Sequence, residues 1–141
     1  MQTLFSKCVP IECSVFRMEA DAIDLEAAAQ SYADLLPESI DVLLLGVGED
    51  GHIASLFPNN VALQERIRRV IPTTGPKPPF ERLTITPQVI TKARSVYVLA
   101  TGPAKAVILS AALRNPNDIW ALPARLTLGG TWLMDSLPHP E

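Results

Sequence analysis

Two short apolar runs, each followed by a glycine, constrain the fold of this 141-residue chain most strongly. Residues 40–45 read Ile-Asp-Val-Leu-Leu-Leu and run into Gly46, and residues 95–100 read Ser-Val-Tyr-Val-Leu-Ala and closely precede Gly102. Short apolar runs of this kind are typical of strands that are buried on both faces of a parallel sheet. They are far too short to cross a bilayer as a helix, which takes roughly 20 apolar residues. We therefore expect two buried parallel strands and no membrane partner.

Segments with helical spacing surround these two runs. Residues 25–36 carry apolar side chains at helical spacing behind Asp24, a capping residue, and residues 104–112 do so behind Pro103. The other expected elements are a short helix over 52–57, a helix over 60–71, a strand over 82–86, one or two helical turns over 87–93, a short helix over 121–126 and a last strand over 131–134. This alternation predicts an α/β fold with a largely parallel sheet.

Length, charge and cysteine content narrow the class of protein. With 48% hydrophobic residues, the chain has enough apolar material for one domain over residues 1–141. Its 15 acidic and 12 basic residues are scattered, so we expect no nucleic-acid partner. The N-terminal residues lack the features of a secretory signal, which predicts a cytoplasmic location. Cys8 and Cys13 have no further ligands at zinc spacing, so we expect reduced thiols and no metal.

The loop after the first apolar run combines glycines with ionisable side chains. Gly46, Gly48 and Gly51 allow the backbone to approach a ligand closely, and Asp50 and His52 stand beside them. Ligands of open α/β sheets bind at the carboxyl ends of the strands, where this loop is expected. An imidazole, with an ordinary pKa of roughly 6.5, can accept or donate a proton near neutral pH without a metal. The alternative is that the glycines only shape the turn and the histidine is structural.

Three cations are candidates for holding an anion. Lys105 falls in the first turn of an expected helix, where a bound anion would offset its unfavourable interaction with the helix dipole. Lys77 and Arg82 flank a cluster of prolines, and the planar guanidinium suits a phosphate or carboxylate. The alternative for each is an ordinary solvated charge. Ser55 is not a candidate nucleophile, because no Gly-x-Ser-x-Gly pattern surrounds it.

Residues 44–58, which read Leu-Leu-Gly-Val-Gly-Glu-Asp-Gly-His-Ile-Ala-Ser-Leu-Phe-Pro, resemble the signature of the 6-phosphogluconolactonases. These enzymes belong to a wider family that includes the glucosamine-6-phosphate deaminases. Further similarity follows in the family's order, in Lys-Pro-Pro at 77–79, Arg-Leu-Thr at 82–84, Thr-Gly-Pro-Ala-Lys-Ala at 101–106 and Leu-Pro-Ala-Arg at 122–125. The resemblance covers most of the chain and is more specific than a bare glycine pattern.

The resemblance implies a Rossmann-like fold and hydrolysis of 6-phospho-D-glucono-1,5-lactone to 6-phosphogluconate, in the oxidative pentose phosphate pathway and without a cofactor. His52 would activate water and then protonate the leaving ring oxygen, while N–H groups of the glycine loop meet the developing oxyanion. Lys105 would hold the substrate phosphate, with Arg82 and Lys77 nearby. The remaining substrate-binding positions lie in the same loop and are Gly46, Gly48, Asp50 and Gly51.

The chain also departs from the family, whose members carry further N-terminal strands with a phosphate loop. It therefore resembles the C-terminal portion of such an enzyme. A parallel sheet without its other strands exposes apolar surface, so we expect self-association or pairing with a complementary segment. Two alternatives to the lactonase remain: a glucosamine-6-phosphate deaminase or isomerase, and a catalytically silent fragment that binds sugar phosphates. Residues 50–58 favour the lactonase, because the deaminases resemble this chain less after the histidine.

Overall fold

A computed structural model describes residues 14–136 of the chain. The expectations for Cys8 and Cys13 therefore lie outside the described residues. In chain order the elements are α2 (Leu25–Leu35), β1 (Val42–Gly46), the 3-10 helix η1 (Val61–Gln64), β2 (Val70–Thr74), β3 (Glu81–Ile85), α3 (Pro87–Lys92), β4 (Ser95–Ala100), α4 (Pro103–Arg114), the 3-10 helix η2 (Pro123–Thr127) and β5 (Thr131–Met134).

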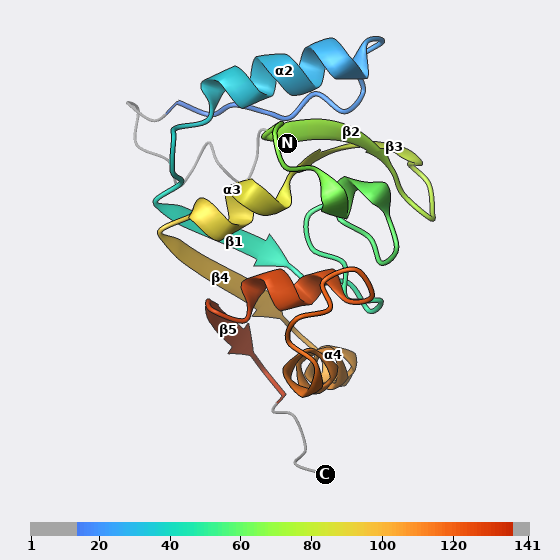
Figure 1. Cartoon of the computed structure of the whole chain (residues 1–141), viewed down its shortest axis with the longest axis vertical. Helices are drawn as coiled ribbons and strands as arrows, with labels where there is room; N and C mark the ends of the chain where they lie inside the picture. Colours follow the sequence, from blue (N-terminus) through green and yellow to red (C-terminus); the bar gives the residue numbers. More distant parts are fainter. Residues whose placement is uncertain (1–13, 137–141) are drawn as a thin grey trace.

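The strands form two sheets, and the larger one is parallel throughout (Figure 1). Its strand order is β1-β4-β5, and the register pairs Gly46 with Leu99, so the carboxyl ends of β1 and β4 lie side by side. The smaller sheet is the antiparallel pair of β2 and β3. Helices connect the parallel strands, as such crossovers require. The expected α/β fold with a largely parallel sheet is confirmed.

Most of the expected helices and strands are present. Helix α2 begins behind Asp24, whose side chain accepts a hydrogen bond from the Ala27 N–H at 3.0 Å, and α4 begins at Pro103. The last strand lies at the expected residues, and the short helix expected over 121–126 is the 3-10 helix η2. Neighbouring residues determine each of these elements, so capping residues and apolar spacing were sufficient to predict them.

The core lies between one face of the parallel sheet and the elements packed on that face. Val98 and Ala100 of β4 are fully buried there, together with Ile90 of α3 and Ala124 of η2. Contacts join α3 and α4 to η2, and η2 to β4. Burying a side chain of the size of Val98 or Ile90 stabilises a fold by roughly 1.5–3 kcal/mol. Burial of these side chains therefore stabilises this face of the sheet.

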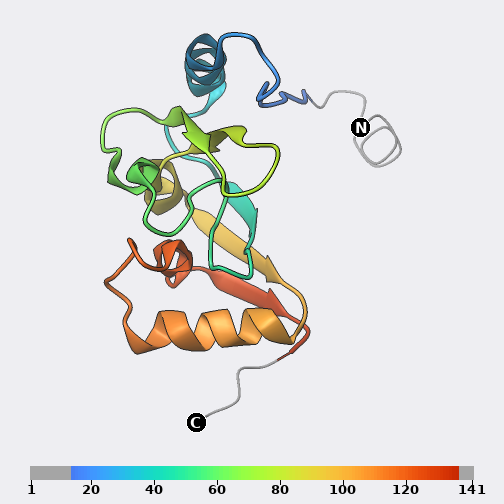
Figure 2. The same cartoon turned by 90° about the vertical axis from the view of Figure 1, so that its right-hand side faces the viewer.

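The opposite face of the parallel sheet is open, contrary to the expectation of strands buried on both faces. Val42 and Leu44 of β1 are 62% and 63% exposed, and Leu99 of β4 and Leu133 of β5 are 51% and 46% exposed. In the register of the sheet these side chains share one face. Figure 2 shows α3 and η2 on the other side of the sheet, and no described helix covers this one. We call these four residues the open sheet face.

The short helix expected over 52–57 is absent. Ala54 has a φ of 50°, which is incompatible with a right-handed helix, and Ile53 forms isolated antiparallel bridges with Val47 and Leu56. The Ser55 N–H donates to the Thr84 hydroxyl at 3.1 Å. Pairing within the loop and to β3 therefore replaces helical hydrogen bonds.

The helix expected over 60–71 is reduced to η1, because the Glu65 carboxylate ends it. This carboxylate accepts hydrogen bonds from the backbone N–H groups of residues 66–68 at 2.8–3.0 Å, and from the Arg68 guanidinium at 2.9 Å. The hydrogen bonds from Arg68 and Ile67 lower the pKa of Glu65 to about 2. A continuing helix would need those same N–H groups, so the chain turns and enters β2 at Val70.

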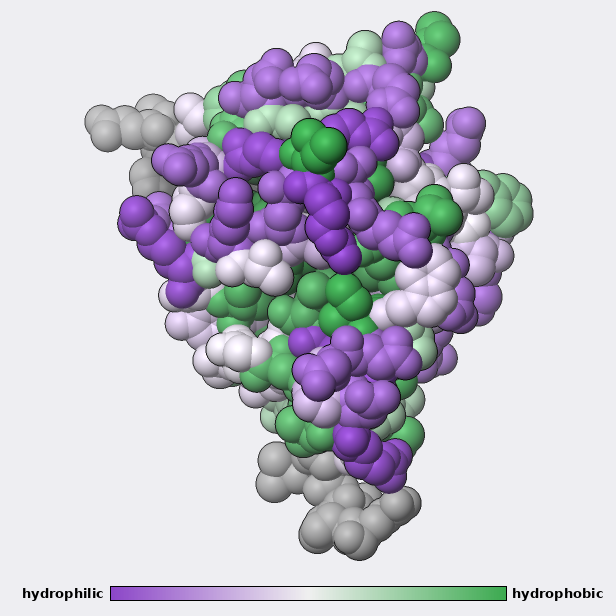
Figure 3. Space-filling model, viewed as in Figure 1, coloured by the Kyte–Doolittle hydropathy of each residue, from purple (hydrophilic) through white to green (hydrophobic). Residues whose placement is uncertain are grey.

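The surface of the described residues is divided by polarity. On the face drawn in Figure 3, hydrophilic side chains cover most of the upper part, over α2 and β2, and a band of apolar side chains separates this part from α4. Among residues 14–136, no helix is both long enough and apolar enough to pass through a membrane.

Candidate active site

The loop that follows β1 closes into a tight turn between Gly48 and His52. The Gly48 N–H donates to the His52 carbonyl at 2.8 Å, and the Gly51 N–H donates to the Gly48 carbonyl at 3.1 Å. Gly51 has a φ of 79°, a left-handed conformation that favours glycine. Directly outside this turn, Val47 pairs with Ile53 in an antiparallel bridge. His52 is thereby held at the carboxyl edge of the sheet.

Asp50 and His52 form a close pair within this turn. Asp50 Oδ1 lies 2.6 Å from His52 Nδ1 and also accepts a hydrogen bond from the His52 backbone N–H at 3.1 Å. The two side chains are 44% and 31% exposed, so water reaches both. Asp50 was expected as a substrate-binding residue, and in the structure it is the hydrogen-bond partner of the His52 ring.

Asp50 also determines which nitrogen of His52 carries a proton. Partial burial tends to raise the pKa of Asp50, but hydrogen bonds from the His52 backbone and imidazole outweigh it and hold the pKa below the ordinary value of 3.8. An ionised carboxylate only accepts hydrogen bonds, so we assign the proton to Nδ1. The lone pair of a neutral ring is then on Nε2, which has no hydrogen-bond partner within residues 14–136. Nε2 is available to accept a proton from water.

Two of the loop glycines are required by the space around them. A Cβ atom at Gly48 would lie 2.1 Å from His52 Nδ1 and 2.6 Å from Asp50 Oδ1. A Cβ atom at Gly51 would lie 2.2 Å from a methyl carbon of Leu122, and the Gly51 carbonyl accepts a hydrogen bond from the Ala124 N–H at 2.9 Å. At Gly46 nothing lies within 4 Å of such an atom. Only the first two glycines are therefore dictated by close contacts.

Phe57 contacts the His52 ring, although sequence chemistry assigns it no role. The two ring centroids are 4.6 Å apart, with an angle of 42° between the ring planes. The Arg82 guanidinium carbon lies over the same phenyl ring, 5.5 Å from its centroid. The only sequence signal for Phe57 is its place within residues 44–58, where an aromatic residue follows the histidine by five positions.

The three candidate cations differ in how closely they approach the His52 and Phe57 rings. The Arg82 guanidinium lies over the Phe57 ring, which in turn contacts His52. Arg82 Nη2 donates a hydrogen bond to the Lys77 carbonyl at 3.3 Å. The Lys77 side chain is exposed on the loop between β2 and β3. Lys105 is half-buried in the first turn of α4, one turn before Ile108, which packs toward Gly51. Among the described residues, no hydrogen bond or ion pair joins either lysine side chain to His52.

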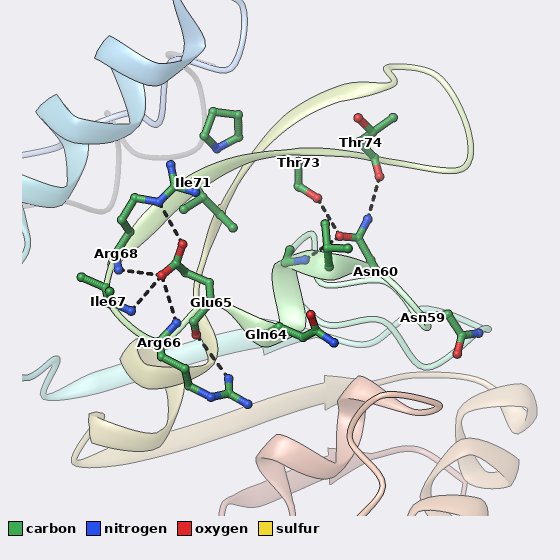
Figure 4. Close-up of a pocket in the computed structure, with 13 residues that line it drawn as sticks. Asn59, Asn60, Gln64, Glu65, Arg66, Ile67, Arg68, Ile71, Thr73 and Thr74 are labelled. Carbon is green, nitrogen blue, oxygen red and sulfur yellow. Dashed lines mark hydrogen bonds and ion pairs between the residues drawn. The ribbon is translucent and has the colours of Figure 1, made fainter.

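A polar hollow of about 780 Å³ lies elsewhere, between η1 and β2, and does not include His52 (Figure 4). Two of its polar side chains are already paired: Asn60 bonds to the Ala62 N–H and the Thr74 carbonyl, and Glu65 bonds as described above. Within residues 14–136, no group of three or more His, Cys, Asp or Glu side chains is arranged to hold a metal ion.

Comparisons with known proteins identify the family of the chain. Residues 1–133 match the family model described as glucosamine-6-phosphate isomerases/6-phosphogluconolactonase. A 6-phosphogluconolactonase of Rattus norvegicus is 39% identical over 145 residues, which cover 94% of this chain and 55% of that protein. One from Mycobacterium leprae is 40% identical, covering 79% of this chain and 50% of that protein. The chain thus spans about half the length of the curated relatives it matches.

The fold is also similar to that of solved family members. The crystal structure of a 6-phosphogluconolactonase from Shewanella baltica superposes with a TM-score of 0.67 and 25% identity, covering 80% of this chain and 53% of that one. A monomeric glucosamine-6-phosphate deaminase superposes with a TM-score of 0.70 and 25% identity, covering 84% of this chain and 56% of that one. Fold similarity therefore does not separate the two activities.

Replacing Gly48 with Ala should break the Asp50–His52 pair, because the new methyl group would overlap both side chains. We expect loss of the His52 Nδ1–H signal in NMR spectra and destabilisation by about 1–3 kcal/mol, the usual cost of overpacking. Gly129→Ala is the matched control, since nothing lies within 4 Å of its Cβ position. An unchanged Nδ1–H signal in Gly48→Ala would contradict the geometry of the turn.

Proposed function

The chain belongs to the glucosamine-6-phosphate isomerase/6-phosphogluconolactonase family, and we propose that its loop after β1 hydrolyses 6-phospho-D-glucono-1,5-lactone to 6-phosphogluconate. The observation that carries the proposal is the Asp50–His52 pair. Its 2.6 Å contact at Nδ1 leaves Nε2 facing no described partner, at the carboxyl edge of a parallel sheet. An imidazole held in this way is suited to general acid–base catalysis.

The proposed reaction uses His52 twice. Nε2 takes a proton from water as the water oxygen bonds to the lactone carbonyl carbon, and backbone N–H groups of the glycine loop stabilise the oxyanion. The tetrahedral intermediate collapses by breaking the bond between that carbon and the ring oxygen, which receives the proton from Nε2. The product is an open-chain carboxylic acid with a new hydroxyl group. Asp50, which is ionised at neutral pH, stabilises the transient imidazolium.

Lys105 is proposed to bind the substrate phosphate, with Arg82 and Lys77 contributing. The N-terminus of α4 is an electropositive position next to the carboxyl end of β4, which neighbours the end of β1. Ile108, one turn after Lys105, packs toward Gly51, so this face of α4 adjoins the glycine loop. Arg82 approaches from the other sheet. The proposed substrate therefore lies between the loop after β1 and α4.

Sequence similarity favours the lactonase over the deaminase. The relatives of Mycobacterium leprae, Rattus norvegicus and Homo sapiens are all named 6-phosphogluconolactonase. The close geometry of Asp50 and His52 argues against a silent fragment, because a remnant that only binds sugar phosphates needs no oriented imidazole. A catalytic role for the pair is the more economical explanation of that geometry.

Replacing His52 with Ala should lower the rate of lactone hydrolysis by at least about 100-fold, the usual contribution of a general base. Asp50→Asn should lower the rate of hydrolysis by the same factor or a smaller one, because the amide side chain permits the wrong tautomer of His52. Both variants should keep the far-UV circular dichroism of the parent chain. A coupled assay that follows 6-phosphogluconate measures the rate. A parental rate in His52→Ala, in a folded chain, would refute the assignment.

Replacing Lys105 with Ala should raise KM for the lactone at least about tenfold and change kcat little, because the phosphate lies away from the reacting carbonyl. The matched control is Lys92→Ala, which removes an exposed lysine from the last turn of α3. The same coupled assay at varied lactone concentration separates the two constants. If the two variants gave equal KM values, Lys105 would have no part in phosphate binding.

We also propose that the open sheet face of Val42, Leu44, Leu99 and Leu133 makes the isolated chain self-associate. Parallel sheets are normally covered on both faces, and contiguous exposed apolar surface favours association. Two copies that bring these faces together would remove the leucines from water. A complementary polypeptide segment would cover the same surface and compete with self-association.

Sedimentation velocity tests this proposal. The parent chain should form dimers or larger species at micromolar concentration, and the double variant Leu44→Asn, Leu99→Asn should shift them toward monomer. Val61→Asn, at a residue 76% exposed in η1, is the control and should behave like the parent. A monomeric parent chain would overturn the proposal.

A further inference from the structure

His52 is incompletely fixed by Asp50 alone. One hydrogen bond at Nδ1 holds an edge of the imidazole but leaves the ring able to tilt about that contact, and the side chain is 31% exposed. A reaction that uses Nε2 for both proton transfers is sensitive to such a tilt, since a displacement of about 1 Å can cost roughly 100-fold in rate. The packing around the ring therefore matters as much as its hydrogen bond.

Phe57 supplies a packing surface for that ring. Its centroid is 4.6 Å from the imidazole centroid and the ring planes are inclined at 42°, within the range of favourable aromatic pairs. Phe57 is itself only 6% exposed and follows the fully buried Leu56 directly. The phenyl ring is thus almost fully buried, and one part of it meets His52.

Arg82 restrains the same phenyl ring. Its guanidinium carbon lies 5.5 Å from the ring centroid, within the range of a cation–π contact. The guanidinium is itself fixed, because Nε donates to the Pro79 carbonyl at 3.0 Å and Nη2 donates to the Lys77 carbonyl at 3.3 Å. Gly75 approaches it so closely that a Cβ there would lie 2.6 Å from Nε. A fixed cation over the ring disfavours rotation of the phenyl group.

We propose that Phe57 is a positioning residue for His52, and that Arg82 holds the Phe57 ring in the orientation that aims Nε2. The proposal rests on the catalytic role of His52 proposed above. Asp50 fixes the Nδ1 edge and Phe57 limits the tilt of the ring, so the imidazole is restrained by two contacts of different kinds. Arg82 thereby links the loop between β2 and β3 to the catalytic group.

The expected effect is on turnover rather than on substrate affinity. Phe57→Leu keeps an apolar side chain but removes the aromatic surface, so kcat should fall about tenfold or more while KM stays within about twofold. Exchange of the His52 Nδ1–H with water should be faster. Phe57→Tyr keeps the ring and should stay within about threefold of the parent chain in both measurements.

Two controls separate positioning from simple loss of stability. Val89→Ala truncates a buried residue of α3, and Phe80→Leu removes an aromatic ring that is 53% exposed on the loop between β2 and β3. Neither substitution alters the Phe57–His52 ring contact, so both variants should keep the parental kcat and Nδ1–H exchange. If Phe57→Leu fails to fold, Phe57→Met takes its place with the same expectation.

The experiment measures kcat, KM, thermal unfolding and Nδ1–H exchange for the full chain and each variant. The chain has only two histidines, so His52→Ala assigns the signal. A fall in kcat and faster exchange confined to Phe57→Leu support the proposal. A parental kcat and exchange in folded Phe57→Leu, or equal losses in Val89→Ala, overturn it. If the parent chain hydrolyses no lactone, the proposed function fails, while the exchange measurement still decides whether Phe57 restrains the ring.

Discussion

The 2.6 Å contact between Asp50 and His52 is the interaction on which the rest of the site depends. It requires a five-residue turn in which the Gly48 N–H reaches the His52 carbonyl and no side chain projects from Gly48. The turn in turn requires the end of β1 at a fixed place, which the register with β4 provides. The orientation of the imidazole therefore depends on the turn, and the turn depends on the sheet. A methyl group at Gly48 would disrupt the turn.

The same short loop serves the core and the site. Ile53 and Leu56, which follow His52, are fully buried, while Phe57 is buried on one side and meets the imidazole on the other. Each buried aliphatic residue contributes roughly 1.5–3 kcal/mol, so the loop is anchored by hydrophobic burial rather than by regular secondary structure. Because the loop is anchored in this way, Asp50 and His52 are held at the carboxyl edge of the sheet.

Sequence patterns predicted the strands and helices whose causes are local, such as the Asp24 cap and the two apolar runs. They failed where a side chain competed for backbone groups: Glu65 captures three N–H groups and ends η1, and Ala54 takes a left-handed conformation in place of a short helix. The sequence could not predict the open sheet face either, because Leu44 is as apolar as its buried neighbour Leu45 and only the packing distinguishes them.

The features of the candidate site also differ in whether the sequence could predict them. His52 and its glycines were visible because residue type and position at a strand end are sequence properties. The sequence could not predict the partner of His52 Nδ1 or the packing of its ring. Both depend on how the turn folds back and on the second sheet, which contributes Arg82. Arg82 illustrates the difference: its planar charge predicted a contact with the substrate phosphate, and only the structure shows its two hydrogen bonds to backbone carbonyls and its place over Phe57. A guanidinium restrained in this way still has N–H groups that can meet an anion, so the phosphate role proposed for Arg82 and its contact with Phe57 are compatible.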